Sequence, residues 1–147
     1  ETPQNVYADL RKLNQVIVGE DAGYMILEFS NGKRALFDGN RHLDHAAENH
    51  RMTLGECIVE GSKGTINLHG DGSLHHRHYG SMETNVILAP QNWKGFAGDC
   101  VYALQNHVIK ALEKSQQFEN TAHQYLNVLK IEEAAYLSNF ESRMVTL

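Results

Sequence analysis

The chain has 147 residues, with 13 basic and 18 acidic side chains, nine histidines, two cysteines and a formal net charge of −5. This length fits one domain, which should bury about 70% of its unfolded surface. The negative charge argues against a general nucleic-acid or membrane-surface binder, because both need a basic face. Apolar runs are far shorter than the roughly 20 residues of a membrane-spanning helix. Two cysteines cannot form a disulfide framework, so we expect Cys57 and Cys100 to be buried thiols in a reducing, cytoplasmic compartment.

Strand-like patterns fill the first two thirds of the chain. The pair Asn31-Gly32 between two apolar runs is the strongest hairpin signal, because both residues accept a positive φ. Glycine-rich turns at 61–64 and 70–72 separate later strands. The expected strands are Val6–Arg11, Ala22–Phe29, Arg34–Arg41, Thr53–Glu60, Thr65–Leu68, Leu74–Tyr79 and Glu83–Leu88. Because short hairpins join them, we expect a largely antiparallel sheet.

The last third of the chain, from about Gly98 to Ser142, has helical periodicity. Asp99 is the expected cap of a first helix, and Asn120 or Thr121 that of a second, because such side chains accept hydrogen bonds from free N–H groups. Apolar residues recur at helical spacing in both and predict an amphipathic face on each. They are Cys100, Ala103, Leu104, Val108, Ala111 and Leu112 in the first helix, and Leu126, Leu129, Tyr136, Leu137 and Phe140 in the second.

This order of strands and then helices predicts an α+β fold. We expect an open, mostly antiparallel β-sheet, covered on one face by the C-terminal helices. A short edge strand at 144–147 would close the chain.

Two regions carry side chains that suit a ligand. An irregular segment between strands contains His42, His45, His50 and Arg51, and such donors suit polyhydroxylated or anionic molecules; the alternative is a polar surface loop. The connector at 93–99 places two aromatic residues among glycines beside a helix N-terminus. It would make a wall for a small polar ligand, or else a hydrophobic plug over the sheet edge.

The run His75-His76-Arg77-His78 offers a weaker metal signal. On a strand His76 and His78 lie on the same face, which gives two possible ligands. Catalytic zinc needs a third ligand, so a solvated or interface strand is favoured. His107 is expected to be a packing histidine. With no GxGxxG, P-loop, GxSxG or CxxC motif, the residues alone define no reaction.

Four blocks of sequence carry a resemblance to a known family. They are GEDAGYMILEFSNGKRALFDGNR, MTLGECIVEGSKGTINLHGDGSL, GFAGDCVYALQNHVIKAL and ENTAHQYLNVLKIEEAAYLSNFESRMVTL. In this order, from about Val6 to Leu147, they resemble the C-terminal domain of the glucose–fructose oxidoreductase / inositol dehydrogenase family (Gfo/Idh/MocA). The resemblance implies a dihydrodipicolinate-reductase-like C-terminal domain. It also implies an NAD(P)-dependent dehydrogenase that acts on sugars, inositols or related polyhydroxylated substrates.

The resemblance also implies what lies outside these residues. The family's Rossmann domain, its catalytic Lys and its Asp/His pair have no counterpart here, and the chain starts at Glu1 rather than Met. We therefore expect residues 1–147 to be the C-terminal substrate-binding and dimerisation domain. An N-terminal Rossmann domain elsewhere would hold NAD or NADP, and this part alone would be inactive, without bound cofactor or metal.

The family layout places the expected substrate contacts at Arg41, His42, His45, Trp93 and Phe96. Asp99 is a weaker candidate because capping already explains it. The open sheet predicts a homodimer or higher homo-oligomer. Two alternatives stay open: a free-standing α+β ligand-binding or scaffold domain, and a metal-dependent enzyme that uses the histidine clusters.

Overall fold

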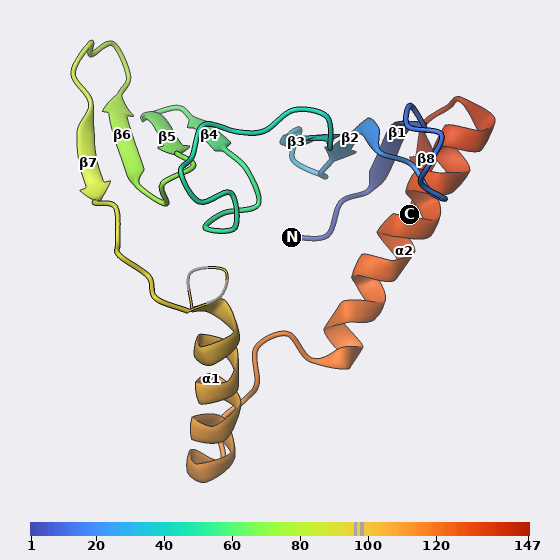
Figure 1. Cartoon of the computed structure of the whole chain (residues 1–147). Helices are drawn as coiled ribbons and strands as arrows, with labels where there is room; N and C mark the ends of the chain where they lie inside the picture. The colour runs from blue at the N-terminus through green and yellow to red at the C-terminus, as the bar shows by residue number, and fades with distance from the viewer. Residues whose placement is uncertain (96, 98) are drawn as a thin grey trace. The chain divides into compact units, whose positions relative to one another are not determined.

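The computed structural model describes residues 1–95, 97 and 99–147. It has two compact units, one of residues 1–43 with 119–147 and one of residues 44–118. The described residues form eight strands and two helices (Figure 1), and every strand pair is antiparallel. The predicted α+β class and antiparallel pairing are confirmed. The strands belong to two sheets of four.

The first unit contains a sheet with the strand order β3-β2-β1-β8. Its elements are β1 (Asn5–Arg11), β2 (Ala22–Glu28), β3 (Arg34–Asn40), α2 (Ala122–Glu141) and β8 (Val145–Thr146). The predicted hairpin is confirmed: Gly32 has a φ of 78°, and its N–H donates to the Phe29 carbonyl at 3.0 Å. Glycine suits this position because it adopts positive φ without steric cost.

The core of this unit lies where α2 packs on β1 (Figure 1). Val6 and Ala8 of β1 are buried together with Ala134 and Ala135 of α2, and Val145 of β8 completes the cluster. Small side chains on both elements let the helix backbone approach the strand closely. The packed face of α2 is therefore built mainly from alanine.

Polar side chains of α2 also bind the free edge of β1. Ser138 has no exposed surface; its Oγ accepts the N–H of Ala8 at 2.9 Å and donates to the carbonyl of Arg143 at 2.6 Å. Asn139 Oδ1 accepts the N–H of Leu10 at 2.7 Å. Beyond Val6, β8 no longer pairs with β1, and the side chains of Ser138 and Asn139 accept the backbone N–H groups that a neighbouring strand would otherwise bind.

The predicted apolar face of α2 is wrong. Its five members are all exposed, by between 38% and 86%: Leu126, Leu129, Tyr136, Leu137 and Phe140. The periodicity identified the helix but not the side that meets the sheet. The start of the helix is confirmed, because Thr121 and Gln124 form a reciprocal capping box.

The second unit contains a sheet with the order β4-β5-β6-β7. Its elements are β4 (Cys57–Gly61), β5 (Gly64–Leu68), β6 (Leu74–His78), β7 (Asn85–Leu88) and α1 (Cys100–Lys114). β4 begins at Cys57 rather than at Thr53, because Thr53 and Gly55 form a turn. In this turn Gly55 has a φ of 143°, and its N–H donates to Thr53 Oγ1 at 3.4 Å.

Three sequence expectations about the second unit are wrong. Cys57 and Cys100 are both exposed instead of buried. Asp99 stands at the N-cap of α1, but it has a φ of 63° and makes no side-chain cap hydrogen bond; a capping side chain needs the extended conformation. Within α1, all of whose residues are described, Ala111 alone is buried, so the predicted apolar face is largely exposed. In the described part of the chain, neither helix has the apolar length that crossing a lipid bilayer requires.

Replacing Ser138 by alanine should destabilise the first unit by about 1–3 kcal/mol, because the buried N–H of Ala8 and the carbonyl of Arg143 would both lose their partner. Urea unfolding followed by circular dichroism measures this loss. Ser30→Ala, in the exposed turn after β2, is the matched control and should change the free energy of unfolding by less than about 0.5 kcal/mol. An equal effect of both substitutions would contradict the assignment.

Candidate functional site

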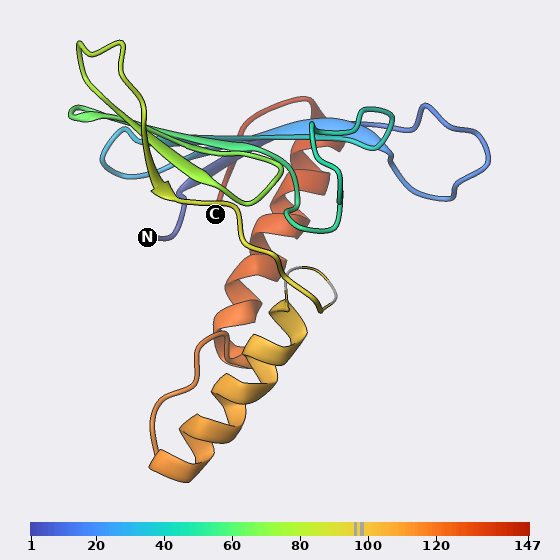
Figure 2. The same cartoon turned by 60° about the vertical axis from the view of Figure 1, so that its left-hand side comes forward.

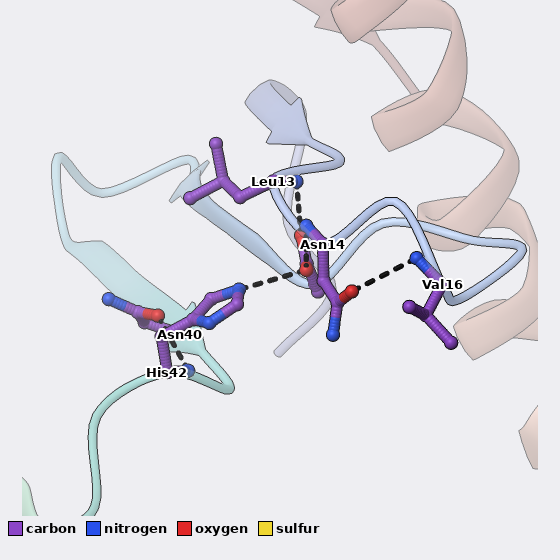
Figure 3. Close-up of polar contacts among 6 residues, drawn as sticks. Leu13, Asn14, Val16, Asn40 and His42 are labelled. Atoms are coloured by element: carbon purple, nitrogen blue, oxygen red, sulfur yellow. Dashed lines mark hydrogen bonds and ion pairs between the residues drawn. The ribbon is translucent and has the colours of Figure 1, made fainter.

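One buried carboxylate joins the β1–β2 loop to the residue pair that follows β3. Asp21 is 4% exposed and accepts the N–H groups of Leu13 at 2.6 Å and Asn14 at 2.7 Å. Nε2 of His42 lies 2.8 Å from Oδ2 of Asp21. Figure 3 shows Leu13, Asn14 and His42 meeting at this point from two separate segments.

The charge of this carboxylate follows from its donors. The N–H of Leu13 is the largest cause that lowers the pKa of Asp21; the N–H of Asn14 and the His42 ring lower it further, while burial opposes them. Asp21 is therefore ionised at neutral pH. An ionised carboxylate only accepts hydrogen bonds, so Nε2 of His42 is the donor.

The backbone around His42 is fixed as well. The N–H of His42 donates to Asn40 Oδ1 at 2.9 Å, and the N–H of Arg41 donates to the carbonyl of Asp21 at 2.9 Å. The side chain of Arg41 is exposed. The predicted candidates Arg41 and His42 thus stand side by side at the end of β3, and His42 is the one held by a buried partner.

The β1–β2 loop has a fixed base and an apolar tip. At the base, the carboxylate of Glu20 accepts the hydroxyl of Tyr136 from α2; this contact lowers the pKa of Glu20 and raises that of Tyr136. At the tip, Val16 is 90% and Val18 99% exposed. In Figure 2 the loop, in blue, extends beyond the ends of the strands.

His45 lies in the second unit, in the segment before β4. Its Nε2 is 3.3 Å from Thr53 Oγ1, and its ring meets that of His50 edge-on at a centroid distance of 5.4 Å. The segment packs on the β5–β6 turn: a Cβ at Gly70 would lie only 2.4 Å from the Ala46 carbonyl oxygen. Glycine at this position therefore allows the histidine-rich segment to lie against the sheet.

Trp93 borders an open cavity of about 530 Å³ along the first turns of α1. The lining residues combine aromatic, amide and charged side chains: Trp93, Asp99, Tyr102, Ala103, Asn106, His107 and Lys110. Tyr102, Asn106 and Lys110 follow one another at i, i+4 spacing, so they share a helix face. This combination offers an aromatic surface and several hydrogen-bonding groups to a small polar molecule.

Sequence reasoning identified only part of this cavity. It placed Trp93 and, with less weight, Asp99 beside a ligand, whereas it took His107 for a packing residue. Phe96 lies outside the described residues. The missed members Tyr102, Asn106 and Lys110 could have been found from their spacing, since they form a polar stripe next to the predicted apolar one.

The histidines of β6 form ring pairs but not a metal centre. The ring centroids of His76 and His78 are 4.3 Å apart, as expected for two residues on one face of a strand. The ring centroids of His75 and His69 are 4.4 Å apart. In the part of the chain that the structure describes, no group of three or more His, Cys, Asp or Glu side chains is arranged to hold a metal ion.

The chain thus folds as an α+β domain, and its second unit carries an open cavity beside Trp93. All of it, residues 1–147, matches the model of the oxidoreductase family, C-terminal alpha/beta domain (Gfo/Idh/MocA). The chain belongs to this family, which confirms the predicted resemblance.

Known proteins similar to the chain are oxidoreductases. A D-apiose dehydrogenase from Paraburkholderia graminis is 28% identical over 141 residues, which cover 92% of this chain and 37% of that protein. An Agrobacterium radiobacter oxidoreductase, solved with NAD+, L-tartaric acid and magnesium, has a TM-score of 0.81 at 21% identity. The match covers 99% of this chain and 43% of the Agrobacterium chain. An aldose-aldose oxidoreductase from Caulobacter crescentus, solved with glycerol, has a TM-score of 0.76 at 18% identity. The match covers 100% of this chain and 42% of the Caulobacter chain. The chain thus spans less than half the length of each.

Replacing Asp21 by asparagine should remove part of the acid sensitivity of the first unit. Because folding lowers the pKa of Asp21, this group stabilises the fold above the ordinary aspartate pKa of about 3.9, and the stabilisation is lost as the pH falls through the folded value. At pH 7 the variant should melt at a lower temperature than the unsubstituted protein. The gap should shrink as the pH falls below about 4.

Thermal unfolding followed across this pH range measures the effect. Asp38→Asn, an exposed carboxylate on β3, is the matched control and should leave the pH dependence unchanged. A constant gap at every pH would show that ionisation of Asp21 does not stabilise the fold.

Proposed function

We propose that residues 1–147 form the substrate-binding and oligomerising domain of an NAD(P)-dependent oxidoreductase that acts on a sugar, an inositol or a related polyhydroxylated compound. Family membership and the similarity to D-apiose dehydrogenase support this proposal. The observation that carries it is the cavity of about 530 Å³ beside Trp93.

The chemistry of the cavity matches such a ligand. The C–H face of a sugar packs on an aromatic ring, and its hydroxyls exchange hydrogen bonds with amide, carboxylate and ammonium groups. Trp93 and Tyr102 supply the rings, while Asn106 and Lys110 supply polar groups on the same side of α1. Holding the substrate in one orientation is the contribution that such a domain makes to the rate.

The proposed redox step needs a nicotinamide nucleotide. When bound, a nicotinamide accepts hydride from a substrate carbon. The chain has no GxGxxG motif, so we assign the nucleotide to an N-terminal Rossmann domain elsewhere in the protein. Residues 1–147 alone should then be inactive, and their own part is to bind and orient the substrate.

The other proposed substrate contacts are Arg41, His42, His45 and Phe96. Arg41 and His42 support this role by their position at the end of β3, where one is exposed and the other is held by Asp21. Arg41 offers a planar fork to hydroxyl or carboxylate oxygens, and the imidazoles offer both donor and acceptor nitrogens.

The oligomer is proposed to form through the sheet of the second unit. One face of this sheet carries two cross-strand rows, Val59-Ile66-His76 and Cys57-Leu68-Leu74-Leu88. Val59 is 59% exposed and Ile66 36%. An exposed apolar face of this kind is typical of surfaces that pair with a second copy. We also propose a cytoplasmic location, which the low cysteine content of two in 147 residues and a nucleotide cofactor favour.

Replacing Trp93 by alanine in the full-length protein should raise the KM for D-apiose about tenfold or more, because the aromatic face of the cavity would be lost. Initial-rate kinetics with NAD+ and with NADP+ measure the effect. Tyr79→Ala, an exposed aromatic residue in the β6–β7 turn, is the control and should leave KM unchanged. If the full-length protein oxidises no sugar or inositol with either nucleotide, the free-standing ligand-binding alternative is favoured.

Replacing Ile66 by glutamate should weaken self-association, because a charge would be buried in the proposed sheet interface. Sedimentation equilibrium of the full-length protein should show a shift from dimer or higher oligomer toward monomer. Leu54→Glu, in the exposed segment before β4, is the matched control and should keep the oligomer. A monomeric unsubstituted protein at high concentration would refute the proposed assembly.

A further inference from the structure

We propose that Asp21 is a positioning residue that fixes the His42 ring in one tautomer, so that Nδ1 of His42 accepts a hydrogen bond from a substrate hydroxyl. The identity of the ligand rests on the proposed function. The fixed tautomer does not, because it follows from the contacts of Asp21 alone.

The carboxylate of Asp21 is itself held in place. Oδ1 accepts the N–H of Leu13, and Oδ2 accepts the N–H of Asn14. Both donors are backbone N–H groups. Unlike a hydroxyl or an imidazole, a backbone N–H cannot rotate its proton away or lose it by titration. With its side chain only 2% exposed, Asp21 forms a rigid acceptor toward which His42 must orient.

The ring of His42 therefore carries its proton on Nε2. The distance of 2.8 Å from Nε2 to Oδ2 is a hydrogen bond, and an ionised carboxylate has no proton to give. In the neutral imidazole the second nitrogen, Nδ1, then has a free lone pair. An aspartate that fixes the tautomer of a histidine in this way is a general device for presenting one ring nitrogen to a ligand.

Nδ1 is open to a ligand while the rest of the residue is anchored. The side chain of His42 is 44% exposed, and among the described residues no hydrogen bond to Nδ1 is found. The backbone N–H of His42 is bound to Asn40 Oδ1, which limits movement of the main chain. A hydroxyl of a polyhydroxylated ligand is the matching donor, and Arg41 beside it offers further donors to the same molecule.

The tautomer is tested without any ligand. Long-range proton–nitrogen NMR spectra of the full-length protein with 15N-labelled histidine, recorded at about pH 8.5, report which ring nitrogen is protonated. His42→Gln assigns the signals. We expect Nε2 protonated and Nδ1 bare for His42. Signals of the opposite tautomer, or averaged signals of both, would overturn the proposal.

Kinetics of the full-length protein with NAD+ and D-apiose test the consequence for binding. Asp21→Asn should raise KM about threefold to tenfold with little change in kcat, since one oriented hydrogen bond to the substrate is weakened. In a His42→Gln background, the same substitution should change KM no further. Equal effects in both backgrounds would show a merely structural role for Asp21 and overturn the proposal.

Two controls match the changes in charge and shape. Asp38→Asn on β3 and His123→Gln on α2 lie in the same unit, are exposed, and should leave KM unchanged. If D-apiose is not oxidised at all, the proposed function fails for this sugar, while the NMR result still decides whether Asp21 fixes His42. If Asp21→Asn does not fold, the tautomer in the unsubstituted protein decides the proposal by itself.

Discussion

The free edge of β1 is the constraint on which the first unit depends. β8 pairs with β1 only at Asn5 and Val6, so the N–H groups further along the edge need other acceptors. Ser138 and Asn139 provide them, and they can do so only if α2 lies against the strand. Hydrogen bonding thus brings the helix close, and the close approach selects alanine for its packed face. Of the large apolar side chains of α2, Ile131 packs against this core, whereas the predicted stripe is left exposed.

This constraint explains which parts of the fold could be predicted from the sequence. Strands and hairpins were predictable because their signals are local: alternating residues, and Asn31-Gly32 at the turn. The capping box at Thr121 is local too. The buried face of α2 could not be predicted in this way. The hydrophobic pattern favoured residues such as Leu129 and Leu137, but the side that faces the sheet is decided by hydrogen bonds to a strand more than 120 residues away.

The same distinction applies to the candidate site. Trp93 was predictable because an aromatic residue among glycines before a helix is a local pattern. The role of Asp21 could not be predicted, because its partners come from two segments. Leu13 and Asn14 lie in the β1–β2 loop, and His42 follows the end of β3. In the sequence Asp21 is only the third residue of a family block. Its importance follows from burial, which makes an ionised carboxylate unfavourable unless several donors surround it.

The two proposed ligand-binding elements, one in each unit, differ in how much they are organised before a ligand arrives. His42 is held through its ring and its backbone, so a hydrogen bond to it costs little conformational entropy. Trp93 is 44% exposed beside an open cavity, so a ligand packed against its ring would cover apolar surface that is now open to water. Under the proposed function, His42 would contribute an oriented hydrogen bond and Trp93 would contribute apolar burial. Sugars suit both kinds of contact, because each of them presents hydroxyls in fixed directions and one C–H face.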